Sequence, residues 1–284
     1  MTKPSRPVLR WHGGKWLLAP WIIEHFPPHR VYVEPFGGAG SVLLRKPKAY
    51  CEVYNDLDGD VVNLFRLLRQ SDADRLVELI RLTPFAREEF VAAYEACDDP
   101  LERARRLVAR SFMGFGSGGA TANSTGFRSN STRSGTTPAE DWGNYPEALE
   151  AVIRRMKGVI VENRPAVDVM RQHDGPETLH YVDPPYLPET RSKSSVGSTT
   201  PKNTYRHELT VEDHIELLDA LTGLSGMVIL SGYPAPLYDD RLRGWQRIER
   251  AALADGARAR TEVLWLNPAA AAKSDQPSLF GEAA

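Results

Sequence analysis

The hydrophobic positions along the chain repeat with two different spacings. From about residue 61 to residue 110 apolar residues recur at intervals of three and four, which predicts amphipathic helices. Elsewhere they alternate with polar residues or run together in short segments, which is typical of β-strands. These strand-like segments cover residues 31–33, 49–56, 156–164, 177–182 and 226–234.

Two elements in the C-terminal half have clear end signals. Thr210 lies three residues before Asp213, as in a capping box, so an amphipathic helix is predicted to begin there. Two strand-like runs between residues 245 and 268 are joined near Asp255-Gly256, a dipeptide favoured in tight hairpins. We therefore expect an antiparallel hairpin at the end of the sheet.

Strands that alternate with helices predict an α/β fold whose sheet is mostly parallel. On this prediction, residues 1–66 and 155–268 form one domain, and the helical residues 67–154 are inserted into it. Residues 269–284 lose all periodicity and are expected to form a flexible C-terminal tail.

The composition narrows the class of protein. The chain has 284 residues, of which 42% are hydrophobic, enough for one large α/β domain and a smaller insertion. Cys51 and Cys97 lie far apart without metal-type spacing, so neither a disulfide framework nor a metal site is expected. The basic N-terminus lacks an apolar segment, and no run approaches the roughly 20 apolar residues of a membrane span. These features predict a protein of the reducing cytoplasm.

The formal net charge is only −2, but the charges are unevenly distributed. Residues 3–15 contain four basic side chains and no acid, and residues 101–137 contain six arginines against Glu102 alone. Such local basic patches are suited to phosphate contacts even when the whole chain is slightly acidic. Solvated helix faces, on which arginines extend into water, would produce the same pattern.

The segment EPFGGAGS, residues 34–41, places glycines between a predicted strand and a helix that opens at Ser41. Such a turn lets a ligand approach the backbone, and the free N–H groups of the helix start point toward it. Position 43 is Leu43, where a dinucleotide fingerprint has its third glycine, so phosphate binding and a nicotinamide-dependent oxidoreductase are disfavoured. Asp56, after the next strand, is placed to bind ribose hydroxyls. A nucleoside without phosphates fits, although tight strand-to-helix packing alone would also use these glycines.

The tetrapeptide Asp183-Pro184-Pro185-Tyr186 follows another predicted strand. Consecutive prolines fix the backbone and remove two N–H donors, which leaves the Pro184 carbonyl as an acceptor beside the Asp183 carboxylate. Tyr186 adds a flat face on which a planar base can stack. The alternative is that the prolines merely end the strand and that the tyrosine is incidental.

Two acceptors beside an aromatic ring suit methyl transfer to an amine. The exocyclic amine of adenine is a poor nucleophile because its lone pair is delocalised into the ring. If Asp183 and the Pro184 carbonyl hold its two N–H bonds, the nitrogen is drawn toward tetrahedral geometry and its lone pair faces an electrophilic methyl group. A base inside a duplex must first rotate out of the stack to reach such a pocket.

Four features in this order, WHGGK at 11–15, EPFGGAGS at 34–41, Asp56 and DPPY at 183–186, resemble the Dam-like, D12-class DNA adenine N6-methyltransferases. The resemblance extends to about Asn267. It implies a Rossmann-like sheet, S-adenosylmethionine as the methyl donor and double-stranded DNA as the substrate. It also implies that the helical insertion recognises the target, and we expect a monomeric enzyme.

The resemblance assigns roles to residues by their positions in these motifs. Asn163 is included because the family often has an Asp-Phe pair where this chain has Glu162-Asn163-Arg164. The implied catalytic residues are Lys15, Asp183, Pro184 and Tyr186. The implied cofactor contacts are Trp11, Lys15, Phe36, Gly38, Gly40, Asp56, Asn163 and Asp183.

Residues 114–137 are rich in glycine, serine, threonine and asparagine, which is typical of a loop. A disordered linker has the same composition, but we favour contact with DNA because arginines here can reach phosphates or guanine edges. A second polar segment with basic residues follows the DPPY motif. The DNA contacts expected from both regions and the preceding helix are Arg110, Arg128, Arg133, Arg191 and Lys193.

The C-terminal tail contains Gln276-Pro277-Ser278-Leu279-Phe280. This segment is similar to the short Gln-x-Ser-Leu-Phe peptides that bind the bacterial replication sliding clamp. A sliding clamp is therefore a candidate partner through residues 276–280, with no membrane partner expected.

Two other functions remain open from the sequence. Related proline-rich acceptor loops also serve methyl transfer to RNA or to a protein amide. A non-catalytic nucleic-acid-binding protein could keep the same fold, although the intact Asp183 argues against it. The basic, loop-containing insertion favours duplex DNA.

Overall fold

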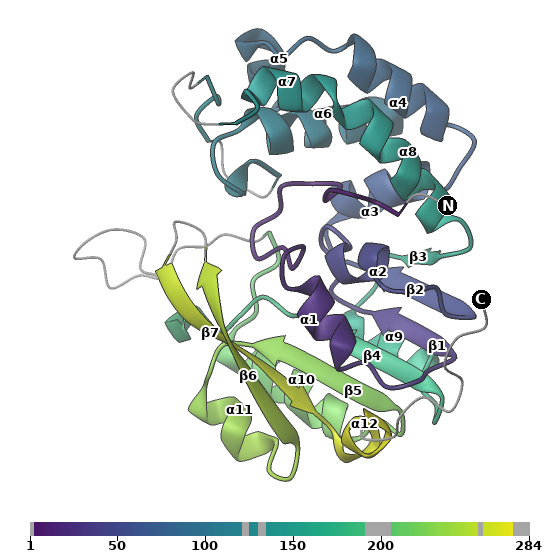
Figure 1. Ribbon diagram of the computed structural model, residues 1–284, viewed down its shortest axis with the longest axis vertical. Coiled ribbons are helices and arrows are strands. Elements are labelled where there is room, and N and C mark those ends of the chain that lie inside the picture. Colours follow the sequence, from purple (N-terminus) through teal and green to yellow (C-terminus); the bar gives the residue numbers. More distant parts are fainter. Residues whose placement is uncertain (1–2, 121–124, 130–134, 191–205, 255–257, 275–284) are drawn as a thin grey trace.

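A seven-stranded sheet in the order β3-β2-β1-β4-β5-β7-β6 forms the centre of the protein (Figure 1). The computed structural model describes residues 3–120, 125–129, 135–190, 206–254 and 258–274. Strands β1 to β5 pair in parallel, and β7 pairs antiparallel with both β5 and β6. The strands are β1 (Val31–Glu34), β2 (Cys51–Asn55), β3 (Ile160–Glu162), β4 (Thr178–Val182), β5 (Met227–Gly232), β6 (Gln246–Ala254) and β7 (Arg258–Leu266). The predicted α/β fold with a mostly parallel sheet is confirmed.

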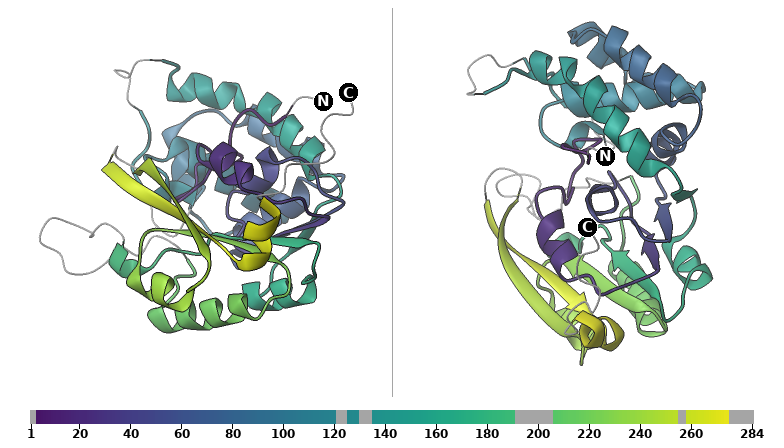
Figure 2. Two further views of the ribbon diagram at one scale, coloured as in Figure 1. Left: turned by 60° about the horizontal axis from the view of Figure 1, so that its bottom comes forward. Right: turned by 45° about the vertical axis from the view of Figure 1, so that its right-hand side comes forward.

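Helices cover both faces of this sheet (Figures 1 and 2). Successive side chains of a strand point to opposite faces, so the two faces carry different residues. Tyr32 and Tyr181 point to the face covered by α1 (Ala19–Glu24), α2 (Ser41–Arg45) and α12 (Pro268–Ser274). Val33 and Val182 point to the opposite face, which is covered by α9 (Ala166–Gln172), α10 (Val211–Thr222) and α11 (Pro236–Arg241).

A layer of helices lies beyond the β3 edge of the sheet (Figure 1). Its central helix is α6, which packs against α3, α4, α5 and α7. The predicted helical insertion, residues 67–154, falls within this layer, and its limits as a recognition unit stay a prediction. The helices of the layer are α3 (Gly59–Leu67), α4 (Ala73–Leu82), α5 (Arg87–Ala92), α6 (Pro100–Met113), α7 (Pro138–Gly143) and α8 (Tyr145–Met156). Short 3₁₀ turns occur at Gly118–Ala120 and Pro188–Thr190.

The capping box and the antiparallel strand pair predicted for the C-terminal half are both present. Thr210 and Asp213 form a reciprocal capping box at the start of α10. Strands β6 and β7 pair antiparallel as far as Ala254 and Arg258, as predicted for a hairpin, and the Asp255-Gly256 dipeptide lies outside the described residues. Among the described residues, we find no helix with both the length and the apolar character needed to cross a membrane.

The prediction of a flexible tail from residue 269 onward is wrong for its first part. Helix α12 continues to Ser274 and packs against β5 and β7. Ala270 is fully buried, and the Lys273 ammonium donates to the Pro176 carbonyl at 2.8 Å. The alanines lack the periodicity of larger apolar residues, yet small side chains suit a helix that lies close to a sheet. Residues 276–280, the predicted clamp-binding segment, lie outside the described residues.

A buried ion cluster connects the helical layer to the sheet. Glu52 of β2, which is 4% exposed, accepts hydrogen bonds from both terminal nitrogens of Arg155 in α8, at 2.6 and 2.8 Å. The Lys46 ammonium donates to the same carboxylate at 2.7 Å. Burial by itself raises the pKa of Glu52, but the bonds and charges of Arg155 and Lys46 hold it below its usual range. The cluster therefore fixes α8 against the strand next to β1.

We expect Arg155→Ala to lower the free energy of unfolding by about 3 kcal/mol, because it breaks a buried charge pair. Lys46 still neutralises part of the Glu52 charge, which limits the loss. The neighbouring variant Arg154→Ala is the matched control, since Arg154 forms an exposed pair with Glu150 at 3.8 Å. It should cost less than about 0.5 kcal/mol. Urea unfolding of both variants measures the difference, and equal losses would contradict the role given to the cluster.

Candidate active site

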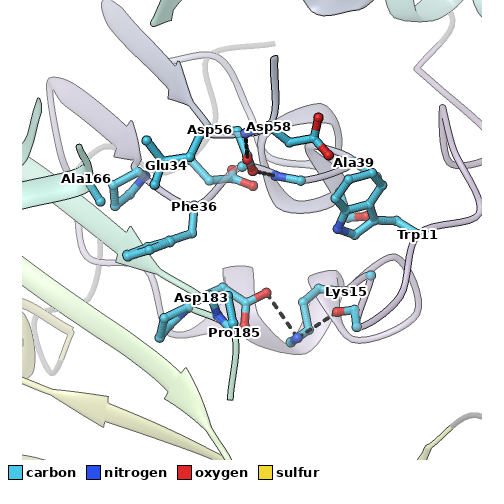
Figure 3. A pocket seen from close by; sticks show the side chains of 18 of the residues that line it. Trp11, Lys15, Glu34, Phe36, Ala39, Asp56, Asp58, Ala166, Asp183 and Pro185 are labelled. Carbon is cyan, nitrogen blue, oxygen red and sulfur yellow. Dashed lines mark hydrogen bonds and ion pairs between the residues drawn. The ribbon is translucent and has the colours of Figure 1, made fainter. Parts of the chain in front are cut away.

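A pocket lies at the carboxyl ends of β1 and β4, which are neighbours in the sheet (Figure 3). Ligands of open α/β sheets bind at this edge, where the loops after parallel strands converge. Its walls come from the N-terminal segment 11–15, most of the turn 34–42, and residues 56–58 and 183–185. The structure thus brings together the separate motifs that the sequence singled out.

The turn after β1 depends on glycine for two reasons. Gly38 and Gly40 have φ angles of 47° and 61°, which residues with a Cβ rarely adopt. Gly37 is needed for space, because a Cβ there would lie 2.2 Å from the Tyr54 ring. A Cβ on Gly38 would lie 2.7 Å from the Trp11 indole nitrogen, so this indole packs directly on the turn. Gly40 caps α2 and is not among the residues that line the pocket.

The Asp56 carboxylate is hydrogen-bonded to the backbone of the glycine turn. One of its oxygens accepts the Gly38 N–H and the other accepts the Asp58 N–H, both at 2.8 Å. Burial raises the pKa of Asp56 to about 6, an increase that these two backbone bonds oppose. Figure 3 shows Asp56 and Asp183 on opposite sides of the pocket. A ligand that contacts both carboxylates must therefore extend across it.

The Asp183 carboxylate is fixed at both oxygens. Oδ2 lies 3.0 Å from the Lys15 ammonium, and Oδ1 accepts a hydrogen bond from the Ser231 hydroxyl at 2.8 Å. Lys15 is 6% exposed and also donates to the Gly13 carbonyl at 2.7 Å (Figure 3). The charge at the end of β4 is therefore presented to the pocket in one defined orientation.

Tyr186 lies beside the pocket rather than in its wall. Its hydroxyl donates to Glu262 at 2.8 Å, and its ring packs edge-on against Tyr233 with centroids 4.7 Å apart. The Lys15 ammonium lies 4.7 Å from the centroid of the Tyr186 ring. Tyr186 and Asp183 thus share Lys15 as a neighbour, so the ring and the carboxylate belong to one cluster.

Comparison with known proteins shows the family to which this chain belongs. Residues 11–223 match the family of D12 class N6 adenine-specific DNA methyltransferases. The chain belongs to this family. It is an adenine-specific DNA methyltransferase, whose substrate is DNA and whose reaction requires a methyl donor.

Relatives of the methyltransferase extend over most of its length. A protein named DNA adenine methylase from Salmonella typhi is 26% identical over 262 residues, which cover 87% of this chain and 86% of the relative. The Type II methyltransferase M1.LlaDCHI from Lactococcus lactis subsp. cremoris is 26% identical over 261 residues, with 83% and 84% covered. A DNA adenine methylase from Vibrio cholerae is 41% identical over a shorter stretch of 68 residues, 24% of each chain.

The structure adds residues to the methyltransferase site that the sequence did not single out. Glu34 lines the pocket at 3% exposure and accepts hydrogen bonds from the Tyr32 hydroxyl at 2.7 Å and the Leu43 N–H at 2.9 Å. Burial raises the pKa of Glu34 to about 8, so its carboxyl is mainly protonated at neutral pH. Glu34 is the first residue of EPFGGAGS, and that position was a signal for this site.

Arg206 is a second addition, at the edge of the pocket. Its guanidinium lies 3.3 Å from Asp58 and 2.7 Å from Asp60, two residues at the start of α3. His207 and Leu209 follow it in the pocket wall. The acidic partners lie far away along the chain, so no local pattern indicated this contact.

The basic helix predicted to face DNA is largely paired within the protein. Asp60 binds Arg103 at 2.7 Å and Arg110 at 3.4 Å, and Glu102 binds both Arg105 and Arg106. Arg110 is only 8% exposed and also donates to the Ala93 carbonyl at 2.9 Å. We therefore withdraw Arg110 as a DNA contact, because its guanidinium is used inside the helical layer.

The remaining predicted contacts have different positions. Arg128 is half-buried, and its backbone N–H donates to the Met113 carbonyl at 2.7 Å, which holds it beside the end of α6. Asn163 donates to the Asp56 and Leu57 carbonyls, so it supports the Asp56 loop from outside the pocket wall. Arg133, Arg191 and Lys193 lie outside the described residues. No group of acidic, histidine and cysteine side chains suited to a metal ion occurs in the described part of the chain.

We expect Gly37→Ala to lower the free energy of unfolding by about 1–3 kcal/mol, because its Cβ overlaps the Tyr54 ring. Gly59→Ala is the matched control: a Cβ there meets no atom within 4 Å, and the residue begins helix α3. This control should change stability by less than about 0.5 kcal/mol or stabilise the helix slightly. Thermal and urea unfolding measure both effects. A Gly37→Ala protein as stable as the wild type would show that the turn does not need this close approach.

Proposed function

We propose that the pocket binds S-adenosylmethionine across the glycine turn and receives an extruded adenine of double-stranded DNA at the DPPY corner. The observation that supports this most directly is the Asp183 carboxylate, fixed by Lys15 and Ser231 and facing a pocket whose opposite wall is the glycine turn. The family membership indicates the reaction, and the geometry of the pocket indicates which residues bind the cofactor and which bind the base.

The residues of the pocket suit a nucleoside-containing cofactor. Trp11 and Phe36 provide apolar surface at its walls, and Gly38 leaves room for close approach to the backbone. The Asp56 carboxylate provides acceptors for two neighbouring ribose hydroxyls, as the sequence predicted. When bound, the cofactor supplies a methyl group on a positively charged sulfur. Glu34 and Asp56 carry no positive charge in either protonation state, so neither repels that sulfur.

The DPPY corner suits the amine of adenine. Asp183 presents a carboxylate oxygen and Pro184 presents a backbone carbonyl, so the two N–H bonds of the amine have two acceptors on a rigid frame. These bonds would direct the nitrogen lone pair toward the methyl group. The N–CH3 bond would form as the methyl–sulfur bond breaks, leaving a neutral thioether, and the surplus proton on the nitrogen would pass to the Asp183 carboxylate that holds it. Ser231 keeps Asp183 in place during this step because it holds the oxygen that Lys15 does not.

Lys15 has a positional role in this proposal. Its ammonium is paired with one oxygen of Asp183 and lies over the Tyr186 ring. An incoming base needs both that carboxylate and that ring. The bond to the Gly13 carbonyl gives the ammonium a second anchor when it shares Asp183 with the base. Lys15 therefore keeps the carboxylate oriented before the base arrives.

The same proposal gives the loop after α6 the role of contacting DNA around the extruded base, and its contacts with the N-terminal segment support that role. Arg10 donates to the Gly114 carbonyl at 3.4 Å, and His12 lies 3.4 Å from the Ser117 hydroxyl. These contacts join the loop to the N-terminal segment that lines the pocket. Arg128 follows Phe127, which bridges to Gly114. Its guanidinium donates to the Phe112 carbonyl at 3.3 Å from a half-buried position, and it is the residue of this loop proposed to contact phosphate or base edges.

We expect the affinity for S-adenosylmethionine to decrease by about tenfold between pH 7 and pH 5. The pKa of Asp56 in the free protein is about 6, so at lower pH the protonated side chain offers fewer acceptors to the ribose. Asp56→Asn should bind more weakly than the wild type at pH 7, with a flatter pH dependence. Isothermal titration calorimetry across this range measures both proteins, and an equal pH dependence would exclude Asp56 as its source.

We expect Asp183→Ala to reduce methyl transfer to DNA by at least about 10²-fold, because the charge that orients the amine is lost. Asp219→Ala is the matched control, since Asp219 is an exposed carboxylate of α10. Transfer of a labelled methyl group to unmethylated bacterial DNA, with RNA as the competing substrate, gives the measurement. Activity retained by Asp183→Ala, or transfer to RNA in preference to DNA, would refute the proposed function.

A further inference from the structure

Glu262 is a buried acid that the reaction described above does not use. It lies on β7 with 8% of its surface exposed, in the segment TEVLWLNP that the sequence indicated only as a strand. The next residue, Val263, pairs with Gly232, which directly follows Ser231 on β5. Strand β7 therefore places Glu262 next to the strand end that already supports Asp183.

The Glu262 carboxylate is bound to the DPPY tyrosine. Its Oε2 accepts the Tyr186 hydroxyl at 2.8 Å. Burial raises the pKa of Glu262, and the Lys15 ammonium and the Tyr186 hydrogen bond oppose this rise. A buried acid is unfavourable for folding unless its partners compensate for lost hydration. An apolar residue would fill the same place more easily, so the acid needs an explanation beyond packing.

The bond has a direct effect on the orientation of the Tyr186 ring. The ring is held at its hydroxyl by Glu262, at one edge by Tyr233, and on a face by the Lys15 ammonium. A base that stacks on an aromatic side chain requires that ring to present a fixed plane. Without Glu262 the hydroxyl would lose its acceptor, and the ring would be free to tilt about its side-chain torsions.

We propose that Glu262 is a positioning residue for methyl transfer, which acts by holding the hydroxyl of Tyr186 so that its ring is correctly oriented for the target base. This inference rests on the proposed role of the DPPY corner in base binding. Glu262 does not itself touch the base or the cofactor. Its effect on the reaction must therefore pass through the Tyr186 hydroxyl, and it must disappear when that hydroxyl is absent.

A double-mutant cycle of Glu262→Ala and Tyr186→Phe tests this dependence, with kcat and KM measured for labelled methyl transfer to unmethylated bacterial DNA. We expect each single variant to lower kcat/KM for DNA by about tenfold, the size of one buried hydrogen bond. The double variant should be no more than about twofold below Tyr186→Phe alone, because both changes remove the same bond. S-adenosylmethionine affinity should be unchanged in all three proteins.

Two further variants separate positioning from general stability. Glu262→Gln keeps an acceptor for the hydroxyl and should recover kcat/KM to within about threefold of the wild type. Glu249→Ala removes an exposed acid from the same hairpin and should have wild-type activity. If Glu262→Ala unfolds at the assay temperature, Glu262→Gln replaces it in the double-mutant cycle. Its smaller loss of kcat/KM should then disappear when Tyr186 is also changed to Phe.

Losses that multiply in the double variant, to about 100-fold, would overturn the inference, because Glu262 would then act independently of the Tyr186 hydroxyl. An unchanged kcat/KM in a folded Glu262→Ala protein would also overturn it. Either result leaves the proposed function intact if the wild type methylates DNA and Asp183→Ala does not. Failure of those two reference proteins would count against the proposed function itself.

Discussion

The site depends on the parallel pairing of β1 with β4. Because the two strands run in the same direction, the turn that follows β1 and the corner that follows β4 meet at one edge of the sheet. Neither segment forms a site alone: the glycine turn offers close approach to a backbone, and the corner offers a carboxylate and a carbonyl. The pairing converts two motifs far apart in the chain into opposite walls of one pocket (Figure 3).

Several acids lie around this edge, Glu34 buried and Asp56 and Asp183 half-buried, and each has a different set of partners. Glu34 is bound to a tyrosine hydroxyl and a backbone N–H, and burial leaves it mainly protonated at neutral pH. Asp56 is held by two backbone N–H groups, and Asp183 by an ammonium and a hydroxyl. Buried acids lose hydration, so their accumulation here is unfavourable for folding and is consistent with a site shaped for binding and reaction.

The helical layer is joined to the sheet and to the edge of the pocket by charge pairs as well as by packing. Glu52 and Arg155 connect β2 to α8, and Asp60 connects α3 to arginines of α6. Arg206 also binds Asp60 while it lines the pocket. The segment that begins at Arg206 and the helices of the layer thus share the Asp60 carboxylate.

The sequence by itself determined the fold class, the order of the motifs and the family. Those features depend on local spacing: alternation for the strands, intervals of three and four for the helices, and glycine or proline wherever the backbone needs them. Only the tertiary structure decided which charged side chains are paired inside the protein. Asp60, remote in sequence from Arg110, pairs with an arginine that was predicted to contact DNA, and Glu262 reaches Tyr186 only because β7 pairs beside β5. The sequence also did not predict the alanine-rich helix α12, because its packing depends on the sheet surface beneath it. Partners that come from distant segments leave no periodic trace in the chain, and so burial and pairing had to be found in three dimensions.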